Sequence, residues 1–115
     1  MTIEEFYNVV GGDYQKVLNR LVNQMLVKKY LRKFVDDPSV PQLRQALAEN
    51  DFASAFRGAH TLKGLAATLG LDELAAVASD LTEQLRYASG QPPVEYVRAV
   101  EQAYQKAVEA IGQLE

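Results

Sequence analysis

Apolar residues along this chain recur at intervals of three and four positions, the spacing that places them on one face of an α-helix. The longest such pattern follows Asp13 and predicts one long amphipathic helix. We expect it to end at Asp36-Asp37-Pro38, because the residue before a proline disfavours helical backbone angles. Ahead of it, Thr2 and Glu5 form a capping box that predicts a short helix, which Gly11-Gly12 would end. The predicted inward positions of the long helix are Val17, Leu18, Leu21, Val22, Met25, Leu26, Leu31 and Phe34.

The remainder of the chain carries further helical patterns and almost no strand signal. Short connections between amphipathic helices favour antiparallel neighbours. The sequence therefore predicts an all-α fold, an up-and-down antiparallel four-helix bundle with additional short helices on its N-terminal side. We expect residues 1–115 to form a single domain of this kind. The patterns predict helices from Ser39 to near Asn50, from Asp51 to Gly70, from Asp72 to Gly90, and from Pro92-Pro93 onwards.

Composition narrows the possible function classes. The chain has no cysteine and one histidine, which excludes disulfides and argues against a zinc site. A net charge of −3 gives no general attraction to nucleic acid. No apolar run approaches the length of a membrane span, and the acidic N-terminus does not resemble a signal peptide. We expect a soluble cytoplasmic protein, free-standing and monomeric, with no nucleic-acid or membrane partner and no bound metal.

The single histidine, His60, lies inside the helix predicted after Asp51. At about 100° per residue, it falls on the flank of the apolar stripe. Lys63 lies about 60° from it toward the core, and Gly64 about 40° to the other side. Side chains at these positions project back over the histidine, so Lys63 would bring a positive charge beside the imidazole while Gly64 leaves a notch. The inward set of this helix is Phe52, Ala55, Phe56, Ala59, Leu62, Ala66 and Leu69.

This arrangement suits a bulky anion that must reach the histidine from solvent. A glycine inside a helix costs roughly 1 kcal/mol relative to alanine, and open access to the imidazole would explain that cost. Neutral imidazole is a nucleophile, and lysine is a mobile cation for phosphate oxygens. Two plainer readings stay open from the residues alone. His60 is an ordinary surface residue in the first, and Gly64 permits close approach of a neighbouring helix in the second.

The string Ala59-His60-Thr61-Leu62-Lys63-Gly64, followed by Leu69-Gly70, closely resembles the signature of histidine phosphotransfer (HPt) domains. Gly11-Gly12-Asp13 looks like the family's entry to its first long helix, and residues 43–52 resemble the segment leading into the histidine-bearing helix. The resemblance implies a four-helix-bundle phosphorelay intermediate. In it, His60 would be phosphorylated on Nε2, Lys63 would hold the phosphoryl oxygens and Gly64 would keep the approach open.

The same resemblance implies that receiver domains are the partners. His60 would accept a phosphoryl group from the phospho-aspartate of one receiver and pass it to another. The chain would need no cofactor, with Mg²⁺ expected on the receiver. It would be a phosphocarrier and not an enzyme, since the sequence has no ATP-binding motif. Geometry suggests a docking face around His60 that includes Lys63 and Gly64 and the residues Arg57, Thr61, Ala67 and Thr68.

Two other function classes are weighed against phosphotransfer. A helical binding module could dock a receiver or another signalling protein without carrying phosphate. A hydrolytic enzyme fits poorly, because Asp72, Glu73 and Asp80 are more simply explained as helix caps and solvated faces. The basic cluster Lys28, Lys29, Arg32 and Lys33 is explained by the helix macrodipole, with a partner site as the minor alternative.

Overall fold

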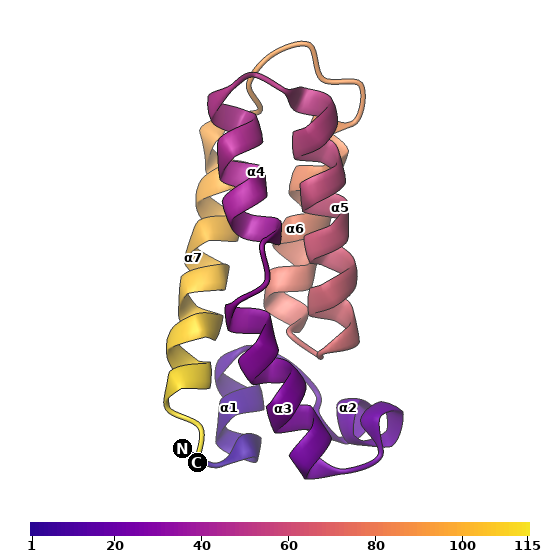
Figure 1. Ribbon diagram of the computed structural model, residues 1–115, viewed down its shortest axis with the longest axis vertical. Coiled ribbons are helices and arrows are strands. Elements are labelled where there is room, and N and C mark those ends of the chain that lie inside the picture. The colour runs from indigo at the N-terminus through magenta and orange to yellow at the C-terminus, as the bar shows by residue number, and fades with distance from the viewer.

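The structure is a computed structural model that describes residues 1–115, and it is entirely helical (Figure 1). The molecule is elongated, with extents of 43 × 23 × 20 Å. The predicted all-α fold, a bundle with short helices on its N-terminal side, is confirmed. The seven helices are α1 (Ile3–Val9), α2 (Tyr14–Leu21), α3 (Gln24–Val35), α4 (Ser39–Ala48), α5 (Phe52–Thr68), α6 (Asp72–Leu85) and α7 (Val94–Gly112).

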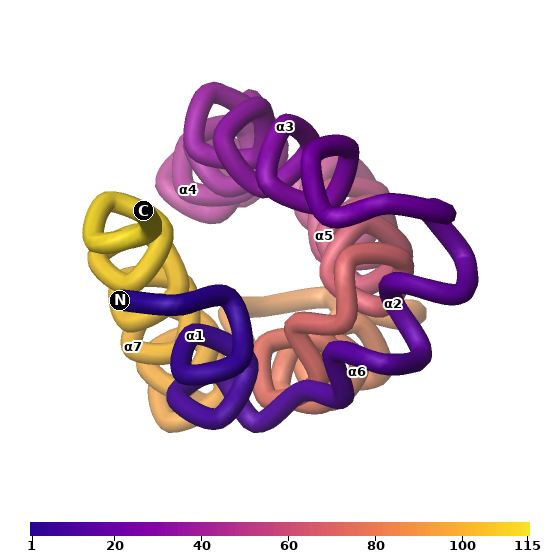
Figure 2. Tube along the Cα trace, turned by 90° about the horizontal axis from the view of Figure 1, so that it is seen from below, coloured from indigo at the N-terminus to yellow at the C-terminus, as the bar shows by residue number.

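The bundle is built from four rods that surround one apolar core. Helix α5 packs between α4 and α6, and α6 packs against α7. Helix α3 continues the rod of α4 downwards and contacts the lower part of α7, while α1 and α2 lie at that lower end (Figures 1 and 2). Twenty-seven buried apolar residues form a continuous core, to which α1 contributes Ile3, Phe6 and Tyr7.

The long helix expected after Asp13 is wrong, because the chain leaves helical geometry between α2 and α3. Val22 has a φ of 77°, and the Asn23 side chain accepts a hydrogen bond from the Leu26 amide at 2.9 Å. Asparagine competes for backbone donors in this way and starts a new helix. Val22 and Met25, which were expected to point inward, are 79% and 80% exposed. The segment between Asp13 and Asp51 thus holds three helices, where the pattern predicts two.

The predicted helix starts agree better with the structure than the predicted stops. The Thr2–Glu5 capping box is present, and Asp13 caps α2 by accepting from the Lys16 amide. Helix α6, however, ends at Leu85 and not near Gly90. Tyr87 follows with a φ of 60°, a left-handed angle that is incompatible with a continuing helix. Val94 begins α7 directly after the two prolines.

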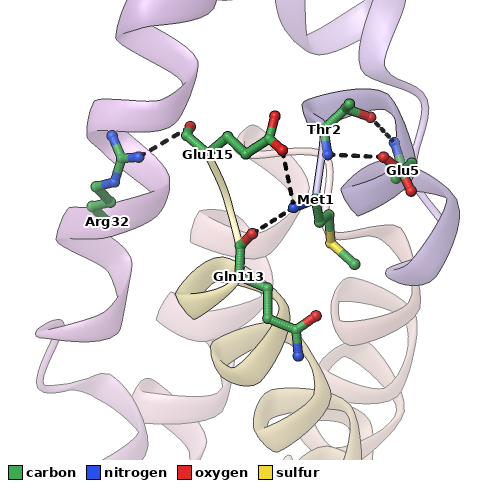
Figure 3. Close-up of polar contacts among 6 residues, drawn as sticks. All are labelled: Met1, Thr2, Glu5, Arg32, Gln113 and Glu115. Atoms are coloured by element: carbon green, nitrogen blue, oxygen red, sulfur yellow. Dashed lines mark hydrogen bonds and ion pairs between the residues drawn. The ribbon is translucent and has the colours of Figure 1, made fainter.

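The first and last residues of the described chain lie side by side (Figure 3). The Met1 amine donates to the Gln113 carbonyl at 2.9 Å, and the Glu115 amide donates to the Met1 carbonyl at 3.1 Å. Arg32 of α3 donates to the Glu115 carbonyl at 3.4 Å, so α3 and α7 are joined at this end. Arg32 therefore makes a tertiary contact beyond the helix macrodipole invoked for its cluster.

Candidate functional site

Helix α5 carries the candidate site and is capped at both ends. Asp51 accepts hydrogen bonds from the Ser54 amide at 3.1 Å and the Ser54 hydroxyl at 2.7 Å. These bonds hold the pKa of the Asp51 carboxyl below its usual range. At the other end, Gly70 has a φ of 72° and donates to the Ala67 carbonyl, while Leu71 donates to the Ala66 carbonyl. This pair of bonds is a Schellman motif, which needs a left-handed residue where glycine stands.

His60 lies midway along α5 and is exposed, between the fully buried residues Ala59 and Leu62. Its ring lies nearly parallel to that of Phe56, with a centroid separation of 6.2 Å and an interplanar angle of 11°. The Phe56 ring is in turn covered by the guanidinium of Arg86, the residue that follows α6, 5.1 Å from its centroid. The imidazole therefore has one aromatic neighbour and stays open to solvent.

Gly64, one turn after His60, faces open space. A Cβ atom built at this position would meet no atom within 4 Å outside its own helix. The reading in which Gly64 permits close helix packing is therefore wrong. Gly58 differs from Gly64, since a Cβ there would come into van der Waals contact with α4, 3.4 Å from Leu43 Cβ and 3.5 Å from Leu43 Cα.

Lys63 lies on the flank of α5 that faces α6, and it is half-buried. Hydrogen bonds from Arg86, at 3.0 and 3.2 Å, are the main cause of the lowered pKa of the Glu83 carboxyl. The positive charge of Lys63 lowers the pKa of Glu83 further. The charge of Lys63, beside the histidine, thus interacts with the Glu83 carboxylate. This relation is apparent only from the packing of α5 on α6.

The four candidate docking residues are all exposed, and three of them line hollows in the surface. Thr61 and Thr68 line a groove between α3 and α5 together with Gly64. Arg57 donates to the Ser54 hydroxyl at 2.9 Å and lines two other hollows, one of them shared with Thr61. Ala67 lines none of these hollows, but its carbonyl accepts a hydrogen bond from Arg20 of α2.

Two residues near the site were missed in the sequence. Arg86 was absent from the candidate set, although its spacing of three from Glu83 on a helix is a recognisable ion-pair signal. Arg20 reaches α5 from a helix 48 positions earlier, and no local pattern indicates that contact. No group of three or more His, Asp or Glu side chains is placed to hold a metal ion. None of the helices is both long and apolar enough to cross a membrane.

The geometry of α5 agrees with comparison to known families. The model of the Hpt domain matches residues 29–112, which is 84 of the 115 residues. This chain belongs to the Hpt domain family. Members are phosphocarrier modules that act in histidine phosphotransfer within phosphorelays and interact with receiver domains. Comparison with curated proteins and with solved structures gave no match.

The matched range begins within α3, so α1 and α2 lie outside it. Residues 11–13, which resemble the start of the family's first long helix, lie outside the match, so the family comparison does not test that likeness. Asp13 caps only the eight-residue α2, and the matched part of the chain starts one helix later. The histidine motif and all the candidate site residues lie inside the match.

Proposed function

We propose that His60 accepts a phosphoryl group from the phospho-aspartate of a receiver domain and passes it to another receiver domain. The observation that carries this proposal is an exposed imidazole next to the empty space over Gly64, in a chain of the Hpt family. An acyl phosphate on a globular partner is bulky and anionic. It can react only with a nucleophile that is unobstructed at the surface, and the imidazole of His60 in the middle of α5 is one.

The transfer requires little of this chain beyond a positioned nucleophile. The Nε2 lone pair of His60 forms the N–P bond as the acyl phosphate P–O bond breaks. The aspartate of the receiver leaves as a carboxylate with the bonding electrons, and the Nδ1 proton passes to water. The reverse order of events delivers the group to the next receiver. Most charge stabilisation in phosphoryl transfer comes from cations around the phosphoryl group, and the partner's Mg²⁺ would supply much of it.

Lys63 would supply a cation from this chain. It lies one turn from His60, and its charge lowers the pKa of Glu83. A phosphoryl group on His60 adds close to two negative charges, which compete with the single charge of Glu83. We expect the Lys63 ammonium to move toward the phosphoryl oxygens when His60 is modified. Arg86 keeps Glu83 paired in that state.

Phe56 would limit how the imidazole turns. Its ring lies nearly parallel to that of His60, and the Arg86 guanidinium lies over the same Phe56 ring. A nucleophile that is held in one orientation loses less entropy on reaching the transition state. Phe56 and Arg86 are therefore positioning residues in this proposal, and His60 is the residue that reacts.

The proposal also covers the oligomeric state of the chain and the compartment in which it acts. Residues 1–115 act as one monomeric domain, in the compartment that holds the receiver domains, which we expect to be the cytoplasm. Phosphate arrives and leaves only through partner proteins. The chain is a phosphocarrier in this scheme and does not itself hydrolyse or synthesise a nucleotide.

Labelling with a phosphorylated receiver tests the proposal. Each receiver domain of the source organism is phosphorylated with acetyl phosphate and mixed with the protein. We expect label on the protein that is lost in acid and retained in base, as for phosphohistidine. His60→Gln removes the nucleophile and should reduce labelling to background.

Label that persists on His60→Gln would remove His60 from the mechanism. The binding-module alternative makes a different prediction for the same experiment. In that case a receiver binds the wild-type chain and His60→Gln equally, and no acid-labile label forms on either. Circular dichroism of His60→Gln provides the folding control, because this exposed side chain contributes nothing to the core.

A further inference from the structure

A groove of about 520 Å³ runs between α3 and α5, beside the candidate site. Its walls are largely apolar, and α2 contributes Leu21 at one end. The remaining lining comes from Tyr30, Lys33 and Phe34 of α3 with Asp37 after it, and from Thr61, Gly64, Leu65 and Thr68 of α5 with Leu69 after it.

Arg20 does not line this groove but lies beside its lining residues Leu21 and Thr68, with its guanidinium held in place. Its Nη1 donates to the Ala67 carbonyl at 3.1 Å and to the Thr68 carbonyl at 2.6 Å, so the last carbonyls of α5 hold the guanidinium in place. None of the four ion pairs in the chain includes Arg20. The side chain is exposed and its other nitrogens make no hydrogen bond within the chain. It is an ordered cation without a counter-charge.

Lys33 is a second cation on the groove. Its ammonium lies 5.8 Å from the centroid of the Tyr30 ring and has no carboxylate partner in the chain. One acidic residue, Asp37, also lines the groove, but its carboxylate accepts a hydrogen bond from the Ser39 amide at 2.9 Å. With Arg20 beside the groove and Lys33 on its wall, two cations face the one carboxylate of Asp37, in a chain whose net charge is −3.

The groove is continuous with the surface that phosphotransfer needs. Thr61 and Gly64 line it and lie within one turn of His60. Thr68, at the far end, is eight residues from His60, which is about 12 Å along a helix. A partner that buries about 800 Å² per side covers a disc of roughly 16 Å radius. A globular partner centred on His60 therefore reaches the groove.

We propose that this groove, with Lys33 on its wall and Arg20 beside its end, is a partner-selecting contact. It receives an apolar segment of the receiver domain whose flanking carboxylates pair with the two cations. The proposal rests on the proposed function, because the same docked receiver presents its phospho-aspartate to His60. Arg20 and Leu21 lie outside the family match, so they supply contacts that the shared fold does not require. These residues would distinguish the receivers of this chain.

Filling the groove tests the apolar part of the proposal. Thr68→Tyr adds a ring at an exposed position on the groove wall, and Gln102→Tyr adds the same ring on an exposed turn of α7. The fastest-transferring receiver serves as one phosphodonor, and phosphoramidate, which needs no docking, serves as the other. We expect the ratio of receiver-dependent to phosphoramidate-dependent labelling to fall at least tenfold for Thr68→Tyr, through a higher KM. Gln102→Tyr should not change the ratio.

Variants that change the charge of Arg20 test its proposed pairing with carboxylates of the receiver. Arg20→Gln keeps an amide donor for the α5 carbonyls but removes the charge, whereas Arg20→Lys keeps the charge. We expect Arg20→Gln to slow receiver association several-fold at low salt and to flatten its salt dependence. Arg20→Lys should keep most of the wild-type salt dependence. A purely structural role for Arg20 would change thermal stability in both variants and leave the salt dependence of association unaltered.

The outcomes separate this proposal from the proposed function. If Thr68→Tyr and the wild type have the same ratio of receiver-dependent to phosphoramidate-dependent labelling, the groove contact is overturned. The proposal that His60 carries the phosphoryl group is unaffected by that result. Absence of label on wild-type His60 from every donor overturns both. A wild-type dimer in sedimentation that Thr68→Tyr converts to a monomer would assign the groove to a second copy of this chain and overturn the receiver as its occupant.

Discussion

The two interior glycines of α5 differ in what lies opposite them. Gly58 faces Leu43 of α4, with which a Cβ would be in van der Waals contact. Gly64 faces no atom of another helix, so the absence of its side chain does not bring a neighbouring helix closer. The same residue type therefore lies against α4 at one position and leaves an opening beside His60 at the other.

Gly64→Ala should stabilise the protein and slow its function. Alanine is favoured over glycine inside a helix by about 1 kcal/mol, and the added methyl group meets no other atom. The methyl group projects back toward His60 and narrows the approach of a receiver. We expect a higher urea midpoint and a lower rate of phosphoryl transfer from the receiver.

Gly112→Ala is the matched control for that variant. Gly112 is the last residue of α7, and a Cβ there also meets nothing. It should leave transfer unchanged. If Gly64→Ala transfers as fast as the wild type while gaining stability, Gly64 has no part in access to His60.

At the scale of the element, α5 is fixed by its ends more than by its interior. Asp51 starts the helix through two bonds to Ser54, and the Gly70 turn finishes it. Its interior contains two glycines, which weaken an isolated helix. The packing of α4 and α6 on either side of α5 provides the remaining stability.

Asp51 should make stability depend on pH in the acid range. Its folded pKa lies below the usual value because the carboxylate accepts bonds from Ser54. The unfolded chain therefore takes up the proton first, near the ordinary aspartate pKa of about 3.9. The contribution is complete above that pH and is lost as the pH falls through the lower folded pKa.

Asp51→Asn keeps a cap oxygen but has no charge to titrate. We expect urea unfolding to show a shallower loss of stability between about pH 5 and pH 3 for this variant. Asp51→Ala should be less stable than the wild type at pH 7 as well, since the cap itself is gone. An Asp51→Asn profile parallel to that of the wild type would show that other carboxylates govern the acid transition.

At the scale of the whole molecule, α1 and α2 hold the end of the histidine-bearing helix. The Tyr7 hydroxyl donates to the Leu69 carbonyl at 2.7 Å, and Arg20 donates to the two preceding carbonyls. Gly12 lies so close to Gly70 that any side chain would collide with its carbonyl. The N-terminal helices, which lie outside the family match, thus order the C-terminal end of α5.

Tyr7→Phe should test how much this contact stabilises the fold. The substitution leaves the buried Leu69 carbonyl without its donor, at a cost of about 1–3 kcal/mol. Burial also raises the pKa of Tyr7, so its hydroxyl remains protonated and able to donate in mildly alkaline solution. We expect a lower urea midpoint and unchanged phosphoramidate labelling of His60. Tyr14→Phe is the control, because Tyr14 stacks on Tyr7 but is less buried. A shift no larger than that of the control would contradict the role given to the hydroxyl.

The sequence by itself determined the local features of this protein. Helical periodicity, the capping residues Thr2, Asp13 and Asp51, and the glycine at position 70 act within one or two turns, so their pattern is visible along the chain. The same holds for the relation of His60, Lys63 and Gly64, which follows from helix geometry alone. These features sufficed to predict a helical bundle with an exposed histidine.

Only the tertiary structure decided which residues from distant helices meet. The pairing of Arg20 with the end of α5 and the nearness of Glu83 to Lys63 both depend on how helices pack. The meaning of the two glycines was decided in the same way, since an empty space and a close contact look identical in a sequence. Contacts between residues far apart in the chain depend on the shapes of both surfaces, and periodicity along one helix contains no information about its neighbour.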